Sequence, residues 1–145
     1  MTGAIPHGAA SGGEAGARAA LGKNDRAVLD VLRGARSGLG AYDILDALRP
    51  AGLKAPLQVY RALNRLMARG LVHKIESLNA YVACARPGDA CAAALAICRA
   101  CGAVSEFTDA EIDRRLNCWC REAAFTPEQV TLEIRGLCTD CAVEA

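Results

Sequence analysis

Apolar residues recur every three or four positions in three successive segments, which predicts three amphipathic helices. The first begins at Asn24, a residue type that caps helices, and ends within residues 34–38. The second covers residues 41–48, and the third starts after Pro56 and ends at Gly70. The expected buried positions are Ala27, Val28, Val31 and Leu32, then Ile44, Leu45 and Leu48, then Val59, Leu63, Leu66 and Met67.

Two short strand-like segments follow the third helix, at residues 71–76 and 80–84, with a turn at 77–79 between them. Three helices followed by a hairpin is the plan of a winged helix-turn-helix. A break rich in proline and glycine at residues 85–90 then predicts a hinge.

The second half of the chain predicts a small α+β unit. Strands are expected at residues 95–98, 103–107 and 129–135, and a helix at 109–124. The inward face of that helix is expected to carry Ile112, Leu116, Trp119, Cys120 and Ala123, while Cys118 is expected to be a free thiol. A unit of this size cannot build a large core, so it calls for dimerisation or a structural metal.

The expected fold class is therefore α+β, an N-terminal winged helix-turn-helix followed by a small αβ dimerisation domain. The predicted domains are a flexible, alanine- and glycine-rich arm at 1–20, a winged-helix DNA-binding domain at 21–84, the hinge at 85–90, and a dimerisation and metal-binding domain at 91–145.

Charge separates the two halves of the chain. Residues 21–84 carry ten Lys and Arg against five Asp and Glu, a net +5, whereas residues 85–145 carry six against ten, a net −4. A basic half joined to an acidic half fits a protein that meets a polyanion with one end, although two solvated surfaces of unequal charge fit as well. The sequence has no membrane-spanning apolar run and no secretory signal, so we expect a cytoplasmic protein with reduced thiols.

The polar face of the third helix offers side chains that can read bases. Gln58, Arg61 and Arg65 lie at i, i+3 and i+7, with Tyr60 and Asn64 beside them. Arg pairs with guanine and Gln with adenine in the major groove, which predicts contact with double-stranded DNA. The alternative is the ordinary solvated face of an amphipathic helix.

The eight cysteines include two Cys-x-x-Cys pairs, Cys98 with Cys101 and Cys138 with Cys141. Their spacing predicts a structural Zn²⁺ bound by four thiolates. Redox-active disulfides are the alternative, but a thioredoxin-type motif belongs at a strand–helix junction, whereas the first pair lies between two predicted strands.

A second set of potential ligands consists of His73, Cys84, Cys91 and Glu106. Two of them belong to the basic half and two to the acidic half, so a shared ion would clamp the halves together. A set of this composition suits Zn²⁺ better than Fe²⁺ or Mn²⁺. Motifs for nucleotide binding, hydrolysis or deamination are absent from the sequence, so it predicts no enzyme and no small-molecule substrate.

Residues 24–141 resemble the ferric uptake regulator superfamily, and most of all its zinc uptake regulator branch. The resemblance rests on the segments 41–46, 59–63, 70–77, 98–102 and 136–141. It implies a homodimeric, metal-dependent repressor in which Tyr60 and Arg61 contact bases and the two cysteine pairs hold structural zinc. It also implies that His73, Cys84 and Glu106 are ligands of a sensing site, whose fourth position carries Cys91 here instead of the histidine of many relatives.

Two further departures separate this chain from the family pattern. Leu57-Gln58 replaces a Pro-Thr pair before the recognition helix, and a histidine-rich stretch typical of iron sensors is missing. The expected function is thus a zinc-responsive repressor of zinc uptake genes with two Zn²⁺ per chain. The alternatives are a sensor of another metal or of oxidants, a thiol-disulfide oxidoreductase, or a zinc-stapled protein-interaction module.

Overall fold

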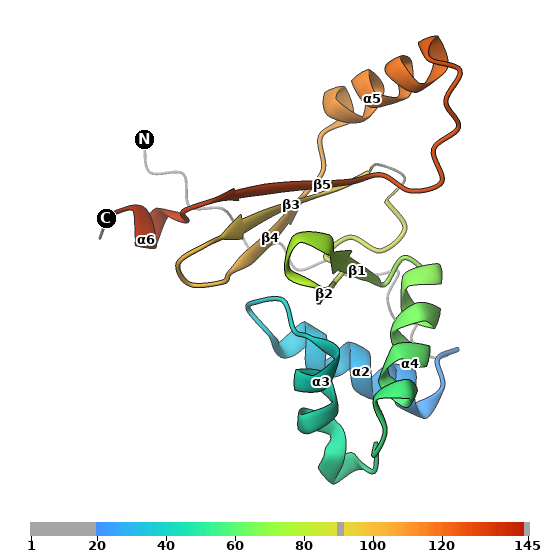
Figure 1. Cartoon of the computed structure of the whole chain (residues 1–145), viewed down its shortest axis with the longest axis vertical. Helices are drawn as coiled ribbons and strands as arrows, with labels where there is room; N and C mark the ends of the chain where they lie inside the picture. The colour runs from blue at the N-terminus through green and yellow to red at the C-terminus, as the bar shows by residue number, and fades with distance from the viewer. Residues whose placement is uncertain (1–19, 90–91, 144–145) are drawn as a thin grey trace.

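The computed structural model describes residues 20–89 and 92–143, and its first part consists of three helices and a hairpin (Figure 1). The elements are α2 (Lys23–Gly34), α3 (Ala41–Leu48), η1 (Arg49–Ala51), α4 (Pro56–Ala68), β1 (Val72–Ile75), η2 (Glu76–Leu78) and β2 (Ala80–Ala83). We refer to residues 20–84 as the N-terminal lobe. Among the described residues, no helix is long and apolar enough to cross a membrane.

The three helices of the N-terminal lobe enclose one hydrophobic core. Most of the predicted stripe residues are buried in it, including Val28, Ile44 and Leu63, while Ala27, Val31 and Met67 pack against it partly exposed. Pro56 opens α4, where its fixed φ suits the first turn and its missing N–H costs nothing. The core therefore fixes α4 with its polar face outward.

The start of α2 differs from the prediction. Gly22 takes the N-cap position without a side-chain cap, and Asn24 already lies inside the helix. The first turn is held in another way, because Asp25 is buried there and accepts hydrogen bonds from the Arg65 guanidinium on α4. The prediction of Asn24 as the cap was wrong.

The hairpin of the N-terminal lobe, which we call the wing (residues 72–83), pairs β1 with β2 in antiparallel register. Leu39 extends this sheet, because its backbone exchanges two hydrogen bonds with Tyr81. Next to it, a Cβ on Gly38 would lie 2.8 Å from Ile75 Cδ1 and 3.1 Å from Ala80 Cβ, so a larger residue here would force side chains of the wing to shift.

The second part, the C-terminal lobe (residues 92–143), is a three-stranded sheet with two helices. Its elements are β3 (Ala93–Cys98), β4 (Val104–Phe107), α5 (Ala110–Glu122), β5 (Thr131–Gly136) and α6 (Thr139–Val143). The strand order is β4-β3-β5, with β3 antiparallel to β4 and parallel to β5. The predicted α+β class, with winged helix first and αβ unit second, is confirmed, whereas the short α6 was not predicted.

The long helix of the C-terminal lobe has no buried residue. Ile112 and Trp119 are exposed and Cys120 is only half-buried, so the predicted core face of this helix is not a core within one chain. Figure 1 shows the reason, since α5 stands away from the sheet instead of covering it. Its amphipathic pattern has no partner within the described residues.

The two lobes meet where the wing lies against the sheet (Figure 1). Ile75 of the wing packs with Leu95 and Ile97 of β3 in a small apolar cluster. At the other end of the contact, Ser37 forms a β-bridge with Ala103, and the Val104 N–H donates to the Arg36 carbonyl at 3.2 Å. The interface between the lobes therefore includes both the wing and the segment before α3.

Candidate metal centres and nucleic-acid interface

The four cysteines of the two Cys-x-x-Cys pairs lie together at the end of the C-terminal sheet, with all four sulfurs within 4.8 Å of one another. Cys98 ends β3, Cys101 lies in the turn to β4, Cys138 follows β5, and Cys141 lies on α6. The parallel pairing of β3 and β5 brings the two pairs side by side, because Cys98 and Gly136 are partners in register. All seven cysteines among the described residues are free thiols.

Hydrogen bonds prepare this cluster for thiolate chemistry. The backbone N–H groups of Cys101 and Cys138 lower the pKa of Cys98 to about 6, and the Cys138 N–H lies 3.4 Å from the Cys98 sulfur. Hydrogen bonds between its thiol and the sulfurs of Cys138 and Cys101 raise the pKa of Cys141 to about 12, and burial adds to the effect. Four thiolates around one divalent cation form the most common closed zinc set. The cluster fits a structural Zn²⁺.

A second cluster lies between the lobes and consists of His73 on β1, Cys84 after β2, and Glu106 on β4. Their ligand atoms also lie within 4.8 Å of one another. The Cys84 thiol donates to Glu106 Oε1 at 3.5 Å, and the other carboxylate oxygen accepts from the Ala85 N–H at 2.7 Å. Two ligands therefore come from the N-terminal lobe and one from the C-terminal lobe.

The electrostatics of this interlobe cluster favour a cation. The Cys84 sulfur and the Glu106 carboxylate raise the pKa of His73 to about 10, against the lowering effect of burial. Burial raises the pKa of Glu106, but His73 and the Ala85 N–H together bring it below its usual value. The Nε2 atom of His73 is buried and lies 3.3 Å from Glu106 Oε1, at an ion-pair distance rather than in a regular hydrogen bond. An imidazole beside a thiol and a carboxylate fits a borderline-soft ion such as Zn²⁺, which would take the place of the imidazole proton.

The fourth predicted ligand of this cluster, Cys91, lies outside the described residues. Three ligands therefore define the interlobe cluster in the structure, and the role of Cys91 stays a prediction.

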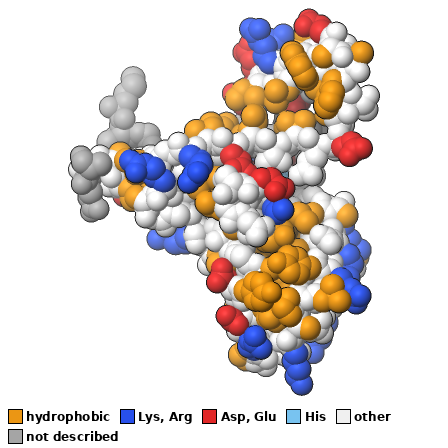
Figure 2. Space-filling view, in the orientation of Figure 1, with side chains coloured by type: hydrophobic (Ala, Val, Ile, Leu, Met, Phe, Trp, Pro, Cys, Tyr) orange, Lys and Arg blue, Asp and Glu red, His pale blue; other side chains and the backbone are white. Residues whose placement is uncertain are grey.

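The polar face of α4 is exposed, as expected for a helix that enters a groove, and basic side chains gather along this outer edge of the molecule (Figure 2). Tyr60, Arg61 and Asn64 are exposed on it. Gln58 is exposed as well, but its Oε1 accepts hydrogen bonds from the backbone N–H groups of Lys54 and Ala55 and so caps the helix.

Arg65 has a second partner that the sequence did not reveal. Its guanidinium donates to both carboxylate oxygens of Asp25 on α2, at 2.7 to 3.2 Å, and this contact raises the pKa of Arg65. Asp25 gave no sign of this role, because an acidic residue in the first turn of a helix is common for its own reasons. The pair ties the polar face of α4 to the neighbouring helix.

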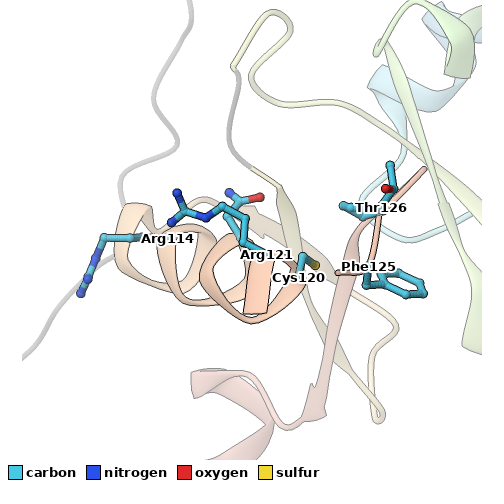
Figure 3. A pocket seen from close by; sticks show the side chains of 7 residues that line it. Arg114, Cys120, Arg121, Phe125 and Thr126 are labelled. Atoms are coloured by element: carbon cyan, nitrogen blue, oxygen red, sulfur yellow. The ribbon is translucent and has the colours of Figure 1, made fainter. Parts of the chain in front are cut away.

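The outer side of α5 carries a shallow pocket lined by two arginines, Arg114 and Arg121, and by the loop that follows the helix (Figure 3). Phe125 in that loop packs on Trp119 with ring centroids 6.0 Å apart. Cys120 lines the pocket, and the Cys118 thiol instead donates to Glu122 at 3.5 Å. The two cysteines thus do not form a chelate with each other.

These features define a winged-helix protein with a four-cysteine cluster in its C-terminal lobe and a mixed-ligand cluster between its lobes. The chain belongs to the ferric uptake regulator family, whose sequence profile matches residues 23–135. This is a family of regulators and not of enzymes, as the absence of catalytic motifs predicted.

Individual relatives agree with this assignment. The chain is 39% identical over 112 residues to the zinc uptake regulation protein of Escherichia coli (strain K12), a match that covers 74% of this chain and 64% of that protein. Among solved structures, holo XcZur matches at 39% identity with a TM-score of 0.78, covering 85% of this chain and 86% of that one. A zinc uptake regulator complexed with zinc and DNA matches at 34% identity with a TM-score of 0.80, covering 85% and 83%.

Proposed function

We propose that the protein is a zinc-responsive transcriptional repressor that binds double-stranded operator DNA as a homodimer and controls zinc uptake genes. The main observation behind this proposal is the interlobe cluster, in which a buried His73 nitrogen lies beside a thiol and a carboxylate. Support comes from the relatives named for zinc uptake regulation and from the similar structure that contains zinc and DNA.

Two Zn²⁺ per chain are part of the proposal. The four thiolates of Cys98, Cys101, Cys138 and Cys141 would hold one ion and so join the end of the sheet to α6. This ion would stay bound permanently, because metal binding at such a site is coupled to folding. His73, Cys84, Glu106 and the predicted ligand Cys91 would hold the other reversibly.

The role of the interlobe site follows from its position. His73 belongs to the wing and Cys84 follows it, whereas Glu106 belongs to the C-terminal sheet. An ion held by ligands of both lobes favours the arrangement in which they are close, and it acts only through its tighter binding to that arrangement. A nearly complete switch needs a preference of about 10⁴-fold between the two arrangements.

We assign residues 21–84 to DNA binding, 85–90 to the hinge, and 91–145 to dimerisation and metal binding. On α4, Tyr60, Arg61 and Asn64 would contact base edges. The side-chain NH₂ group of Gln58 would lie beside them, since its Oε1 caps the helix. Arg65 would contribute mainly by holding α4 in place through Asp25.

A second copy of the chain is the partner that the C-terminal lobe fits. Strand β5 lies at the edge of the sheet and has Ile134 exposed, and α5 turns Ile112 and Trp119 to solvent. An unpaired strand edge beside an apolar helix is an unstable surface for a monomer. Isologous pairing would cover it and place two copies of α4 on successive major grooves.

The test is a zinc titration of purified full-length protein against a duplex carrying the promoter region of a zinc uptake gene of its genome, with a scrambled duplex of equal length as control. The duplex should be bound only when the second zinc site fills. Variants His73→Ala and Cys84→Ser should lose zinc-dependent binding, while Cys118→Ser should behave as wild type. Binding that persists unchanged in both cluster variants would contradict the sensing site.

Titrations with Fe²⁺ and Mn²⁺ under anaerobic conditions separate a zinc sensor from a sensor of another metal. Arg61→Ala should weaken operator binding by about 1–3 kcal/mol at saturating zinc. Unchanged affinity in this variant would argue against base reading by α4.

A further inference from the structure

A row of three side chains crosses the C-terminal sheet and faces the wing. Leu95 on β3 is the register partner of Glu106 on β4 and of Glu133 on β5. Register partners project from the same face of a sheet, so a carboxylate flanks the buried Leu95 on each side. Leu95 packs against Ile75 of the wing.

The two carboxylates reach opposite ends of strand β1. Glu106 approaches His73 near its start, as part of the interlobe cluster. Glu133 approaches its far end, where Oε1 accepts a hydrogen bond from the Glu76 N–H at 2.7 Å and Oε2 lies 3.3 Å from the Ser77 N. The C-terminal sheet therefore contacts β1 of the wing near both ends of the strand through a carboxylate, and Ile75 makes the apolar contact between them.

The contact of Glu133 uses backbone groups that have no other partner in the wing. Glu76 and Ser77 open the 3-10 helix η2, whose first N–H groups cannot bond within it. Ser77 and the Glu76 N–H lower the pKa of Glu133, so the carboxylate is ionised and accepts strongly. Unlike Glu106, it is a member of neither metal cluster found among the described residues.

We propose that Glu133 is a positioning residue for the metal response, a zinc-independent latch that holds the wing against the C-terminal sheet. This inference rests on the proposed function. Because the latch forms only when the lobes are close, it lowers the cost of the arrangement that the interlobe ion requires. Its removal should weaken zinc binding at His73, Cys84 and Glu106 without touching those ligands.

The first measurement is hydrogen–deuterium exchange at the amides of Glu76 and Ser77 in the full-length protein. Exchange should be slow in the wild type and faster in Glu133→Ala. Glu128→Ala is the matched control, because Glu128 is an exposed glutamate in the loop before β5, and its exchange pattern should equal that of the wild type. Fast exchange of both amides in the wild type would overturn the latch.

The second measurement is the affinity of each zinc site by competition with a chelator, using Zn²⁺ alone as the probe. Glu133→Ala should weaken the interlobe site about three- to tenfold and leave the four-cysteine site unchanged, as expected for the loss of one charged hydrogen-bond acceptor. Glu133→Gln keeps one acceptor oxygen and should fall between, and it carries the test alone if the alanine variant does not fold. Equal interlobe affinity in the variants and the wild type would overturn the proposal.

These readouts need no DNA, so they separate the latch from the repressor function. A wild-type protein that binds only one zinc would contradict the proposed sensing function and, with it, the latch as a device for the metal response. An intact two-site wild type with an unaffected Glu133→Ala variant would contradict the latch alone.

Discussion

The two lobes of this protein are stabilised in different ways. The N-terminal lobe contains one cluster of sixteen buried residues, whereas the cluster of the C-terminal lobe has two buried residues of its own, Leu95 and Ile97, and takes the third, Ile75, from the wing. The long helix α5 has no fully buried residue. A lobe without a sufficient core needs other interactions, and here the candidates are a metal, a second copy and the neighbouring lobe.

This difference has a functional consequence. A well-packed N-terminal lobe holds α4 as a rigid surface, because close-packed cores resist distortion. Under the proposed function, the C-terminal lobe would depend on interactions that respond to conditions, namely zinc and protein concentration. The response to zinc would then change the relation between the lobes without deforming the surface proposed to meet DNA.

The largest expected effect comes from breaking the four-cysteine cluster. Cys138→Ser, or removal of zinc by a strong chelator, should unfold the C-terminal lobe, because structural zinc supplies about 10–16 kcal/mol of apparent binding energy in small domains. Far-UV circular dichroism and amide exchange resolved by lobe will measure this. The helices of the N-terminal lobe should remain protected.

Cys118→Ser is the matched control, because Cys118 belongs to neither metal cluster and its thiol donates to Glu122 on its own helix. It should leave both the zinc content and the unfolding curve unchanged. A C-terminal lobe that keeps its structure without the ion would show that its few apolar contacts suffice, and the contrast between the lobes would be weaker than the burial suggests.

The second prediction concerns the core of the N-terminal lobe. Leu63 on α4 is fully buried, so Leu63→Ala should reduce the free energy of unfolding of this lobe by about 2–5 kcal/mol. The matched control on the same helix is Leu57→Ala, because Leu57 is 56% exposed. Denaturant unfolding followed by circular dichroism compares the two, and equal losses would show that the burial pattern of α4 does not decide stability.

The third prediction tests whether the exposed strand β5 forms the interface with a second copy of the chain. Ile134→Asp places a charge on the exposed edge strand β5 and should weaken dimerisation about 10- to 100-fold. This corresponds to a loss of about 1.4–2.8 kcal/mol in the free energy of dimerisation. Sedimentation equilibrium over a range of protein concentrations measures this. Leu78→Asp in the wing adds the same charge at another exposed apolar position and should not change the dimer. An unaltered dimer in the Ile134 variant would place the interface elsewhere.

The same contrast shows what the sequence can predict. The helices of the N-terminal lobe follow from periodicity, because their apolar stripes are buried within the lobe itself, and the range 41–48 is that of α3. The stripe of α5 has the same pattern but no partner among the described residues, so burial could not be predicted from it. Periodicity predicts that the apolar face of a helix will be covered, but it does not indicate whether the same chain or a second molecule covers it.

The two metal clusters also differ in how far the sequence predicts them. The spacing of the Cys-x-x-Cys pairs predicts the first cluster, and the structure brings their four sulfurs together. The interlobe set is spread over both lobes, so the sequence identified His73, Cys84 and Glu106 only as members of a set of candidate ligands divided between the two halves, and the resemblance to a family gave them the role of a sensing site. The contacts of Asp25 and Glu133 had no sequence signal at all, because each depends on a tertiary neighbour that is 40 or more residues away.

The smallest expected effect separates two ion pairs of the N-terminal lobe that differ in burial. Asp25 is buried and bonded to Arg65, while Asp46 pairs with Arg49 one turn away with both side chains largely exposed. Asp25→Asn should reduce the stability of the N-terminal lobe by about 1–2 kcal/mol, because a buried group loses a charged hydrogen bond. Asp46→Asn should cost about 0.2–0.5 kcal/mol, the value of an exposed pair at i, i+3 spacing.

Operator binding at saturating zinc makes this last comparison functional. If Arg65 holds α4 in place through Asp25, then Asp25→Asn should weaken DNA binding, whereas a direct phosphate or base contact by a freed Arg65 would strengthen it. Asp46→Asn should leave DNA binding unchanged, since its partner lies outside α4. Denaturant unfolding and fluorescence anisotropy on the same two variants measure both quantities, and tighter DNA binding by Asp25→Asn would assign Arg65 to the DNA contact after all.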